Sequence, residues 1–405
     1  MQTSSEQNQQ KNQSNNHPKK SLVALIKCES YESVEVEKAV ERGIELLGGM
    51  SAFFVKGESI VLKPNLLSRH KPEDGVTTHP AVFRAVAKKL ISVGINVSYG
   101  DSPPTDKFVN ISQATGMTAV AEELNIPAAD FETGSPVYSD GGEQRRQFNI
   151  ATGVLSADGL VNLPKLKTHH LTRLTGAVKN LFGCVPGFQK PEFHVKLPTV
   201  ADFSKMLVDL NRLINQRLVV MDAVQAMQGN GPTFGSLVPL HLLIVSTDPV
   251  AVDSTACRII GVSPELMLTN YYGQQFGLGN MKEENITIVG DPITDFYRPD
   301  FIVQRTPELR FNQAWKYRIL KNYISTRPVI DRTKCTLCGA CARQCPMDPK
   351  ALIWKTKKHR RPPKYNYRRC IRCFCCQEVC PNGAIAGKNP FLRRLIDKMY
   401  RLGVI

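Results

Sequence analysis

The chain has 405 residues, of which 42% are hydrophobic, so it is long and apolar enough for more than one domain with a sizeable core. No apolar run approaches the roughly 18 residues of a membrane-spanning helix, so we expect a soluble or peripheral protein. The formal net charge is +16, but residues 309–405 hold 23 Lys and Arg against 4 Asp and Glu, a surplus of 19, and the preceding residues therefore sum to −3. The positive charge belongs to the C-terminal quarter alone.

Residues 1–20 are rich in Gln, Asn, Ser and Lys, which predicts a disordered tail without the apolar core of a secretory signal. From residue 22 onward, short apolar runs alternate with segments of helical periodicity. We expect strands at 22–27, 59–63, 96–100, 159–163, 218–221, 240–245 and 286–289, and helices at 34–47, 80–93, 111–124, 171–183, 203–215 and 249–260. This alternation predicts an α/β domain with a largely parallel sheet over residues 21–291.

Residues 292–329 read as a linker with a basic, aromatic helix around 315–318, and residues 389–405 as a basic amphipathic helix. The apolar side of that last helix holds Phe391, Leu392, Leu395, Ile396, Met399 and Tyr400, and its other side holds Arg393, Arg394, Lys398 and Arg401. Two interpretations stay open for it: docking on the preceding domain, or peripheral contact with a membrane surface.

Nine of the twelve cysteines fall between residues 335 and 380, in two runs of the form Cys-x2-Cys-x2-Cys-x3-Cys-Pro. In bacterial two-cluster ferredoxins, three thiolates of such a run hold one cubane and the fourth ligates the other cluster. The spacing therefore predicts two [4Fe–4S] clusters in a small α+β ferredoxin-like domain over residues 330–388. The expected ligands are Cys335, Cys338, Cys341 and Cys380 for cluster 1, and Cys370, Cys373, Cys376 and Cys345 for cluster 2.

Zinc sites and disulfides are the alternatives for these cysteines. Zinc sites usually close on paired Cys-x2-Cys or Cys/His units, and disulfides need an oxidising compartment. The spacing favours clusters over both, in a reducing cytoplasm. Cys375 lies out of register and is expected to be a bystander thiol.

Polar residues follow the predicted strands of the α/β domain. Ligands of open α/β sheets bind beyond the carboxyl ends of the strands, so we expect one convergent anionic-ligand site there. Its candidate binding residues are Lys63, Asn65, Asp101, Lys179, Asp222 and Asp248. The candidate catalytic residues are Lys165, Lys167, His169 and Cys184, with Lys190 and His194 nearby. The alternative for these charged residues is structural: the aspartates would cap helices and the lysines would be solvated. Three interpretations stay open for Cys184, namely a nucleophile, a metal ligand or a buried filler.

Several of these segments resemble the bacterial and archaeal domain-of-unknown-function 362 family, which is often fused to a two-cluster ferredoxin. The matching segments are Lys63-Pro64-Asn65-Leu66-Leu67, Gly100-Asp101-Ser102-Pro103, residues 163–187, Met221-Asp222-Ala223, Gly229-Asn230-Gly231-Pro232 and Asp248-Pro249-Val250-Ala251-Val252-Asp253. The ferredoxin resemblance implies electron transfer through the eight assigned cysteines. Lys63-Pro64 and Thr78-His79-Pro80 also resemble nickel-pincer lactate racemases, from which no residue role is carried over.

The sequence favours an iron–sulfur electron-transfer protein whose α/β domain binds an anionic small molecule, either an oxidoreductase or its electron-carrying subunit. Two alternatives stay open: a ferredoxin-type carrier with an α/β docking module, and a non-redox isomerase with structural clusters. The basic C-terminal quarter predicts an acidic redox partner protein, or else balances cluster charge. No nucleic acid partner is expected, because no nucleic-acid-binding motif is present. We expect a cytoplasmic location.

Overall fold

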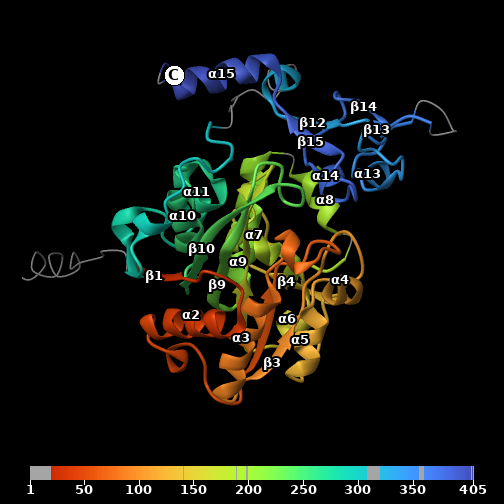
Figure 1. The fold of residues 1–405 in the computed structure, drawn as a ribbon. Helices are drawn as coiled ribbons and strands as arrows, with labels where there is room; N and C mark the ends of the chain where they lie inside the picture. Colours follow the sequence, from red (N-terminus) through yellow and green to blue (C-terminus); the bar gives the residue numbers. More distant parts are fainter. Residues whose placement is uncertain are drawn as a thin grey trace, which may run out of the picture.

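The computed structural model in Figure 1 describes residues 20–139, 141–187, 189–197, 199–307, 320–354, 360–402 and 404. The predicted tail up to residue 19 and the predicted basic helix around 315–318 lie outside the described residues. Among the described residues, no helix is long and apolar enough to cross a membrane.

Nine strands of the described chain build one sheet, whose main path runs in the order β11-β1-β10-β9-β6-β2-β3, with β7 beside β9 and β8 beside β7. Its strands are β1 (Ser21–Lys27), β2 (Ser59–Pro64), β3 (Asn96–Tyr99), β6 (Gly159–Leu163), β7 (Lys165–His169), β8 (Arg173–Leu174), β9 (Gln216–Gln228), β10 (Ser236–Ser246) and β11 (Ile286–Gly290). The predictions for β1, β2, β3, β6 and β11 are confirmed to within one residue. The predicted largely parallel sheet is also confirmed.

One long strand of the sheet runs against the others. β10 is antiparallel to both of its neighbours, β1 and β9, whereas β9 pairs in parallel with β6 and β7. A residue that follows β10 therefore lies at the opposite edge of the sheet from residues that follow β2, β3 and β6. This reversal decides which of the predicted site residues can meet.

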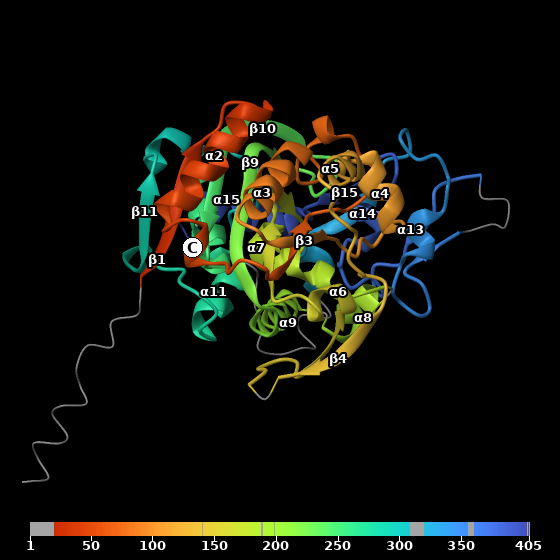
Figure 2. The same ribbon diagram turned by 90° about the horizontal axis from the view of Figure 1, so that it is seen from below.

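Helices cover both faces of the sheet, as Figure 2 shows with α2 and α3 on one side and α9 and α11 on the other. Alternate residues of a strand point to opposite faces, so Ala24 and Ile26 of β1 pack with α2 while Val23 and Leu25 pack toward α10. The helices are α2 (Ser33–Leu46), α3 (Pro80–Ser92), α4 (Phe108–Ala114), α5 (Met117–Glu123), α6 (Thr152–Leu155), α7 (Gly176–Asn180), α8 (Gln189–Lys196), α9 (Val200–Leu213), α10 (Pro249–Ile259) and α11 (Leu268–Gln275). Short 3-10 turns complete this domain: η2 (Met50–Ala52), η3 (Pro72–Asp74), η4 (Leu181–Cys184), η5 (Pro264–Leu266), η6 (Glu283–Asn285) and η7 (Ile293–Phe296).

Two predicted helices are wrong as single elements. The helix expected over 171–183 is instead the strand β8, the short helix α7 and the turn η4, because Arg173 and Gly176 have φ values of 67° and 62° that a right-handed helix does not allow. The helix expected over 111–124 is divided into α4 and α5 at Gly116, whose φ is 77°. Neither the hairpin of β4 (Gly134–Tyr138) and β5 (Gln147–Ala151) nor the strand β7 was predicted.

The C-terminal region repeats a simple plan around the two cysteine runs. β12 (Arg327–Ile330) pairs with β15 (Ile385–Lys388), and β13 (Leu352–Ile353) pairs with β14 (Lys364–Tyr365). Each run contains one helical turn, α13 (Ala340–Arg343) or α14 (Cys375–Glu378). The last helix, α15 (Phe391–Arg401), lies beyond this region at the top of Figure 1.

Candidate functional site

The eight predicted cluster cysteines line two separate cavities. Cys335, Cys338 and Cys341 share one cavity with Cys380 from the other run. Cys370, Cys373 and Cys376 share the second cavity with Cys345 from the first run. This crossed grouping is the one that the spacing predicts, and four cysteines lining one cavity match the number of ligands that a cubane requires.

The turn α14 of the second run docks directly on the α/β domain. His169 Nε2 lies 2.9 Å from Glu378 Oε1, while the Leu171 and Thr172 backbone N–H groups donate to His169 Nδ1 at 3.1 and 3.3 Å. Because Nδ1 accepts these bonds, Nε2 carries the proton and donates to Glu378. Burial lowers the pKa of His169 to about 4. The predicted catalytic histidine thus joins the two parts of the molecule.

Two further contacts extend this docking surface. The His170 ring stacks on the Phe374 ring, with centroids 4.7 Å apart. Gln377 Nε2 donates to Asn230 Oδ1 at 2.7 Å, in the glycine-rich Gly229–Pro232 loop. The glycine-rich loop, which is one of the segments that resemble the DUF362 family, therefore receives α14.

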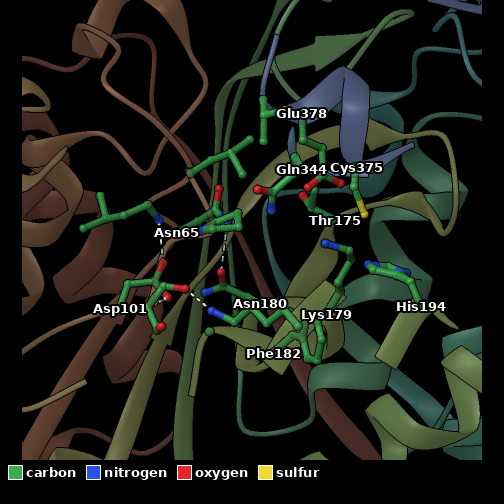
Figure 3. A pocket seen from close by; sticks show the side chains of 17 residues that line it. Asn65, Asp101, Thr175, Lys179, Asn180, Phe182, His194, Gln344, Cys375 and Glu378 are labelled. Carbon is green, nitrogen blue, oxygen red and sulfur yellow. Dashed lines mark hydrogen bonds between the residues drawn. The ribbon is translucent and has the colours of Figure 1, made fainter. Parts of the chain in front are cut away.

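A cavity lies where α14 meets the carboxyl ends of the parallel strands (Figure 3). The volume open to the centres of water molecules is about 90 Å³, enough for several waters or a small molecule. The α/β domain contributes Asn65, Asp101, Ser102, Thr175, Lys179, Asn180, Lys190 and His194 to its wall, and the C-terminal region contributes Gln344, Cys375, Glu378 and Val379. Gln344 and Cys375 each directly precede a cysteine of the second cluster cavity.

Asp101, which lines this interdomain cavity, forms a fixed ion pair with Lys63 behind the cavity wall. Lys63 Nζ lies 2.9 Å from Asp101 Oδ1, and both side chains are buried. The backbone N–H groups of Leu66 and Ser102 donate to the same carboxylate at 2.8 Å each. A Cβ on Gly183 would collide with Asp101 and come within 2.6 Å of Lys63 Nζ, so only glycine fits at position 183.

Further polar groups line the same cavity. Asn65 Oδ1 is buried without a hydrogen-bond partner among the described residues, although its amide nitrogen donates to Asn180 Oδ1 at 3.0 Å. The Lys179 amine extends toward Thr175 and Glu378 (Figure 3), and burial lowers its pKa. Burial also lowers the pKa of Lys190 to about 8 and that of His194 to about 4. An orphaned acceptor beside partly desolvated amines suits a ligand that brings a negative charge and a hydrogen-bond donor.

Two of the predicted catalytic lysines lie outside the cavity. Lys165 Nζ contacts Asp222 Oδ2 at 2.9 Å and Tyr31 Oη at 2.7 Å, both inside the protein. Asp222 also accepts hydrogen bonds from Tyr31 and from the backbone of His79. Lys167 Nζ donates to the Val76 carbonyl, and burial lowers its pKa well below the usual value. These lysines and Asp222 are satisfied by the protein itself.

Two more predicted residues do not reach the cavity. Asp248 follows the antiparallel strand β10, so the prediction that it joins the site is wrong. It caps α10, accepting from Val250 N and Ala251 N at 2.8 and 3.0 Å. Cys184 is fully buried, and burial raises its pKa to about 12, so of the three interpretations left open the buried filler fits best.

Six of the sequence candidates lie together in or directly behind the cavity wall: Lys63, Asn65, Asp101, Lys179, Lys190 and His194. Sequence reasoning missed Thr175, Asn180, Gln344 and Glu378. Asn180 follows Lys179 directly, so its place in the dense basic run was the available signal. Nothing in the local sequence marks Gln344 or Glu378, because their role depends on how the two parts of the molecule meet.

Two family models match the chain: a domain of unknown function, DUF362, at residues 60–258, and a 4Fe-4S dicluster domain at residues 327–381. A thylakoid-associated protein of Synechocystis is 33% identical over 257 residues, which cover 63% of this chain and 79% of that protein. An uncharacterized ferredoxin of Methanocaldococcus jannaschii is 37% identical over 57 residues, which cover 14% of this chain and 71% of that protein.

Among solved structures, the lactate racemase apoprotein from Thermoanaerobacterium thermosaccharolyticum aligns with a TM-score of 0.40 and 13% identity, covering 60% of this chain and 57% of that one. The chain thus spans little more than half of that solved relative. The α/β fold, the C-terminal ferredoxin-like region and its iron–sulfur clusters follow from the family matches and the cysteine geometry together. The chain belongs to the DUF362 family, with a 4Fe-4S dicluster domain at its C-terminal end.

Proposed function

We propose that this protein is an iron–sulfur oxidoreductase in which two [4Fe–4S] clusters exchange electrons with a small anion in the interdomain cavity. The observation that carries the proposal is the cavity wall itself. Gln344 and Cys375 line it, and each is the direct chain neighbour of a cysteine in the second cluster cavity. Buried amines of the α/β domain face the same space. A redox centre and an anion site would therefore share one boundary.

The eight cysteines would hold the clusters in the crossed pattern described above, with two clusters rather than one. The clusters supply one-electron transfer when they are bound. The chain around them provides the rest: the 23 basic residues of the C-terminal quarter would attract an acidic redox partner protein at its surface. The Synechocystis relative is named for its association with thylakoids, and for this chain we propose a cytoplasmic location.

Within the cavity, the side chains would have separate roles. Lys179 would bind the negative charge of the ligand, and that charge would raise the depressed pKa of its amine. The orphaned Asn65 Oδ1 would accept a hydrogen bond from a donor on the ligand. The Lys63–Asp101 pair would hold the wall in shape, since its charges already satisfy each other. These side chains and α14 together would limit the access of water.

The test is reoxidation of the reduced holoprotein under anaerobic conditions by small anions that can accept its electrons. Pyruvate takes two electrons and two protons to become lactate, and nitrite takes one electron and two protons to give nitric oxide and water. We expect at least one of them to reoxidise the clusters faster than buffer does. Lys179→Met should slow that reaction at least about tenfold, because it removes a charged contact worth about 1.4 kcal/mol or more. Lys282→Met is the matched control, because Lys282 is exposed and does not line the cavity. Equal rates for the two variants would contradict the proposal.

A second function is favoured by one specific observation. His169, His170 and Asn230 are occupied in holding α14, as a docking module for a ferredoxin-type carrier would require. In that case no anion would alter the reoxidation rate, and the protein would still pass electrons to an acidic partner. The same reoxidation assay, repeated with a flavodoxin-like acidic acceptor, separates the two functions.

A further inference from the structure

The last helix, α15, attaches to the protein by its polar side. Arg393 and Asp397 are 3% and 6% exposed, and Arg393 Nε donates to Asp397 Oδ1 at 2.7 Å. Asp397 also accepts from Thr306 Oγ1 at 2.7 Å and from Asn389 Nδ2 at 2.9 Å. These bonds fix the rotation of the helix about its axis, because they come from one pair of residues a single turn apart.

The apolar side of α15 consequently faces outward. Phe391 is 76% exposed, Leu392 40%, Leu395 45% and Leu402 67%, while Val404 beyond the helix is 63% exposed. Positions 391, 395 and 402 lie within a narrow arc at 3.6 residues per turn, with 392 beside them. A globular helix normally buries this face and exposes the charged one, so α15 has the reverse orientation.

The residues that flank the apolar face are basic. Arg394 and Lys398 are exposed on α15, and Lys388 is exposed just before it. In the sequence, residues 309–405 have a surplus of 19 positive charges. An outward apolar stripe edged by basic side chains fits a surface that is apolar inside and negative at its edge, which is the interface of an anionic lipid bilayer. A second copy of the chain would bring the same positive charges against each other, which disfavours self-association through this face.

We propose that α15 is an amphipathic anchor that binds the surface of an anionic membrane, with Phe391, Leu392, Leu395 and Leu402 in the acyl boundary and Arg394, Lys398 and Lys388 at the lipid phosphates. The helix extends from the same end of the molecule as the cluster region (Figure 1), so membrane binding would hold the clusters close to the bilayer. This inference stands apart from the proposed redox function, since it depends only on α15 and its attachment.

The experiment is co-sedimentation of the full-length holoprotein with vesicles of phosphatidylcholine containing 30% phosphatidylglycerol. We expect binding that falls at least tenfold for Phe391→Asp, because one fully buried aromatic side chain alone accounts for about that factor. Val34→Asp is the matched control: Val34 is also in the first turn of a helix and is 65% exposed, but it lies on α2. Binding should also fall in 0.5 M salt and with vesicles of phosphatidylcholine alone.

Three results would overturn the proposal: no binding to the anionic vesicles, equal binding of the Phe391→Asp and Val34→Asp variants, or equal binding to neutral vesicles. Sedimentation velocity without lipid completes the test. A dimer that Phe391→Asp dissociates, with no vesicle binding, would assign the face to self-association instead. Iron content and the circular dichroism of each variant show whether it is folded.

Discussion

The buried pair of Lys165 and Asp222 gives the sharpest test of the structure. Both side chains are at most 1% exposed, and their charged atoms are 2.9 Å apart. Lys165→Met removes the cation and leaves the Asp222 carboxylate inside the protein with only its neutral donors, which include the Tyr31 hydroxyl at 2.8 Å. Breaking a buried pair from one side costs about 3–5 kcal/mol in the free energy of unfolding.

Removing both charges together measures the interaction between them. The Lys165→Met/Asp222→Asn double variant removes both charges, so we expect it to recover part of the loss, with an interaction energy of about 1–3 kcal/mol between the two sites. Denaturant unfolding of the holoprotein, followed by far-UV circular dichroism, measures these differences. Lys27→Met is the control, because the Lys27–Glu29 pair is exposed and contributes nothing that this assay resolves.

Two outcomes would refute this reasoning. A loss below about 1 kcal/mol for Lys165→Met would show that the pair is not the buried, charged unit described here. A double variant that loses the full sum of the single variants would show that Lys165 and Asp222 do not interact.

Three further predictions concern residues in or behind the cavity wall. Gly183→Ala should lower the free energy of unfolding by about 1–3 kcal/mol, the cost of overpacking, because its Cβ collides with Asp101; thermal unfolding measures this loss. Burial lowers the pKa of Lys190 from its ordinary value of 10.5 to about 8, so between these pH values the unfolded chain binds more protons than the folded protein. The free energy of unfolding, relative to that of Lys190→Met, should therefore rise from about pH 8 to about pH 10.5, by up to about 3 kcal/mol. Denaturant unfolding at a series of pH values measures this rise. Cys184, with a pKa of about 12, should resist iodoacetamide at pH 8 in the native protein and react after denaturation, as mass spectrometry of the alkylated peptide reports.

The sequence predicted the cluster region well because the information there is local. The spacing of cysteines within each run depends on the chemistry of one loop, and the crossed grouping follows from the same rule. The strands β2, β3 and β6 were predictable for a similar reason, since β2 and β6 are short, largely apolar runs and β3 alternates polar and apolar residues, and polar residues follow each of them. Lys63, Asn65 and Asp101 then meet because these strands are parallel neighbours.

The remaining part of the site depends on long-range pairing that no local pattern contains. Asp248 looks like the other strand-end residues until the reversed direction of β10 places it at the far edge. The Lys165–His169 segment was expected to be a strand-end loop, but it pairs with β9 and becomes a strand itself. His169 was chosen for its chemistry, and its actual partner, Glu378, lies 209 residues away in the chain.

The central claim is that a cluster and an anion site share one boundary, and electron paramagnetic resonance of the reduced protein tests it most directly. We predict about eight irons per chain, the content of two cubanes, and a coupled two-cluster signal. We also predict that oxalate or pyruvate changes the signal in the wild type and in Lys282→Met but not in Lys179→Met. About four irons in fully loaded protein, or a signal that no anion alters in any variant, would contradict the account.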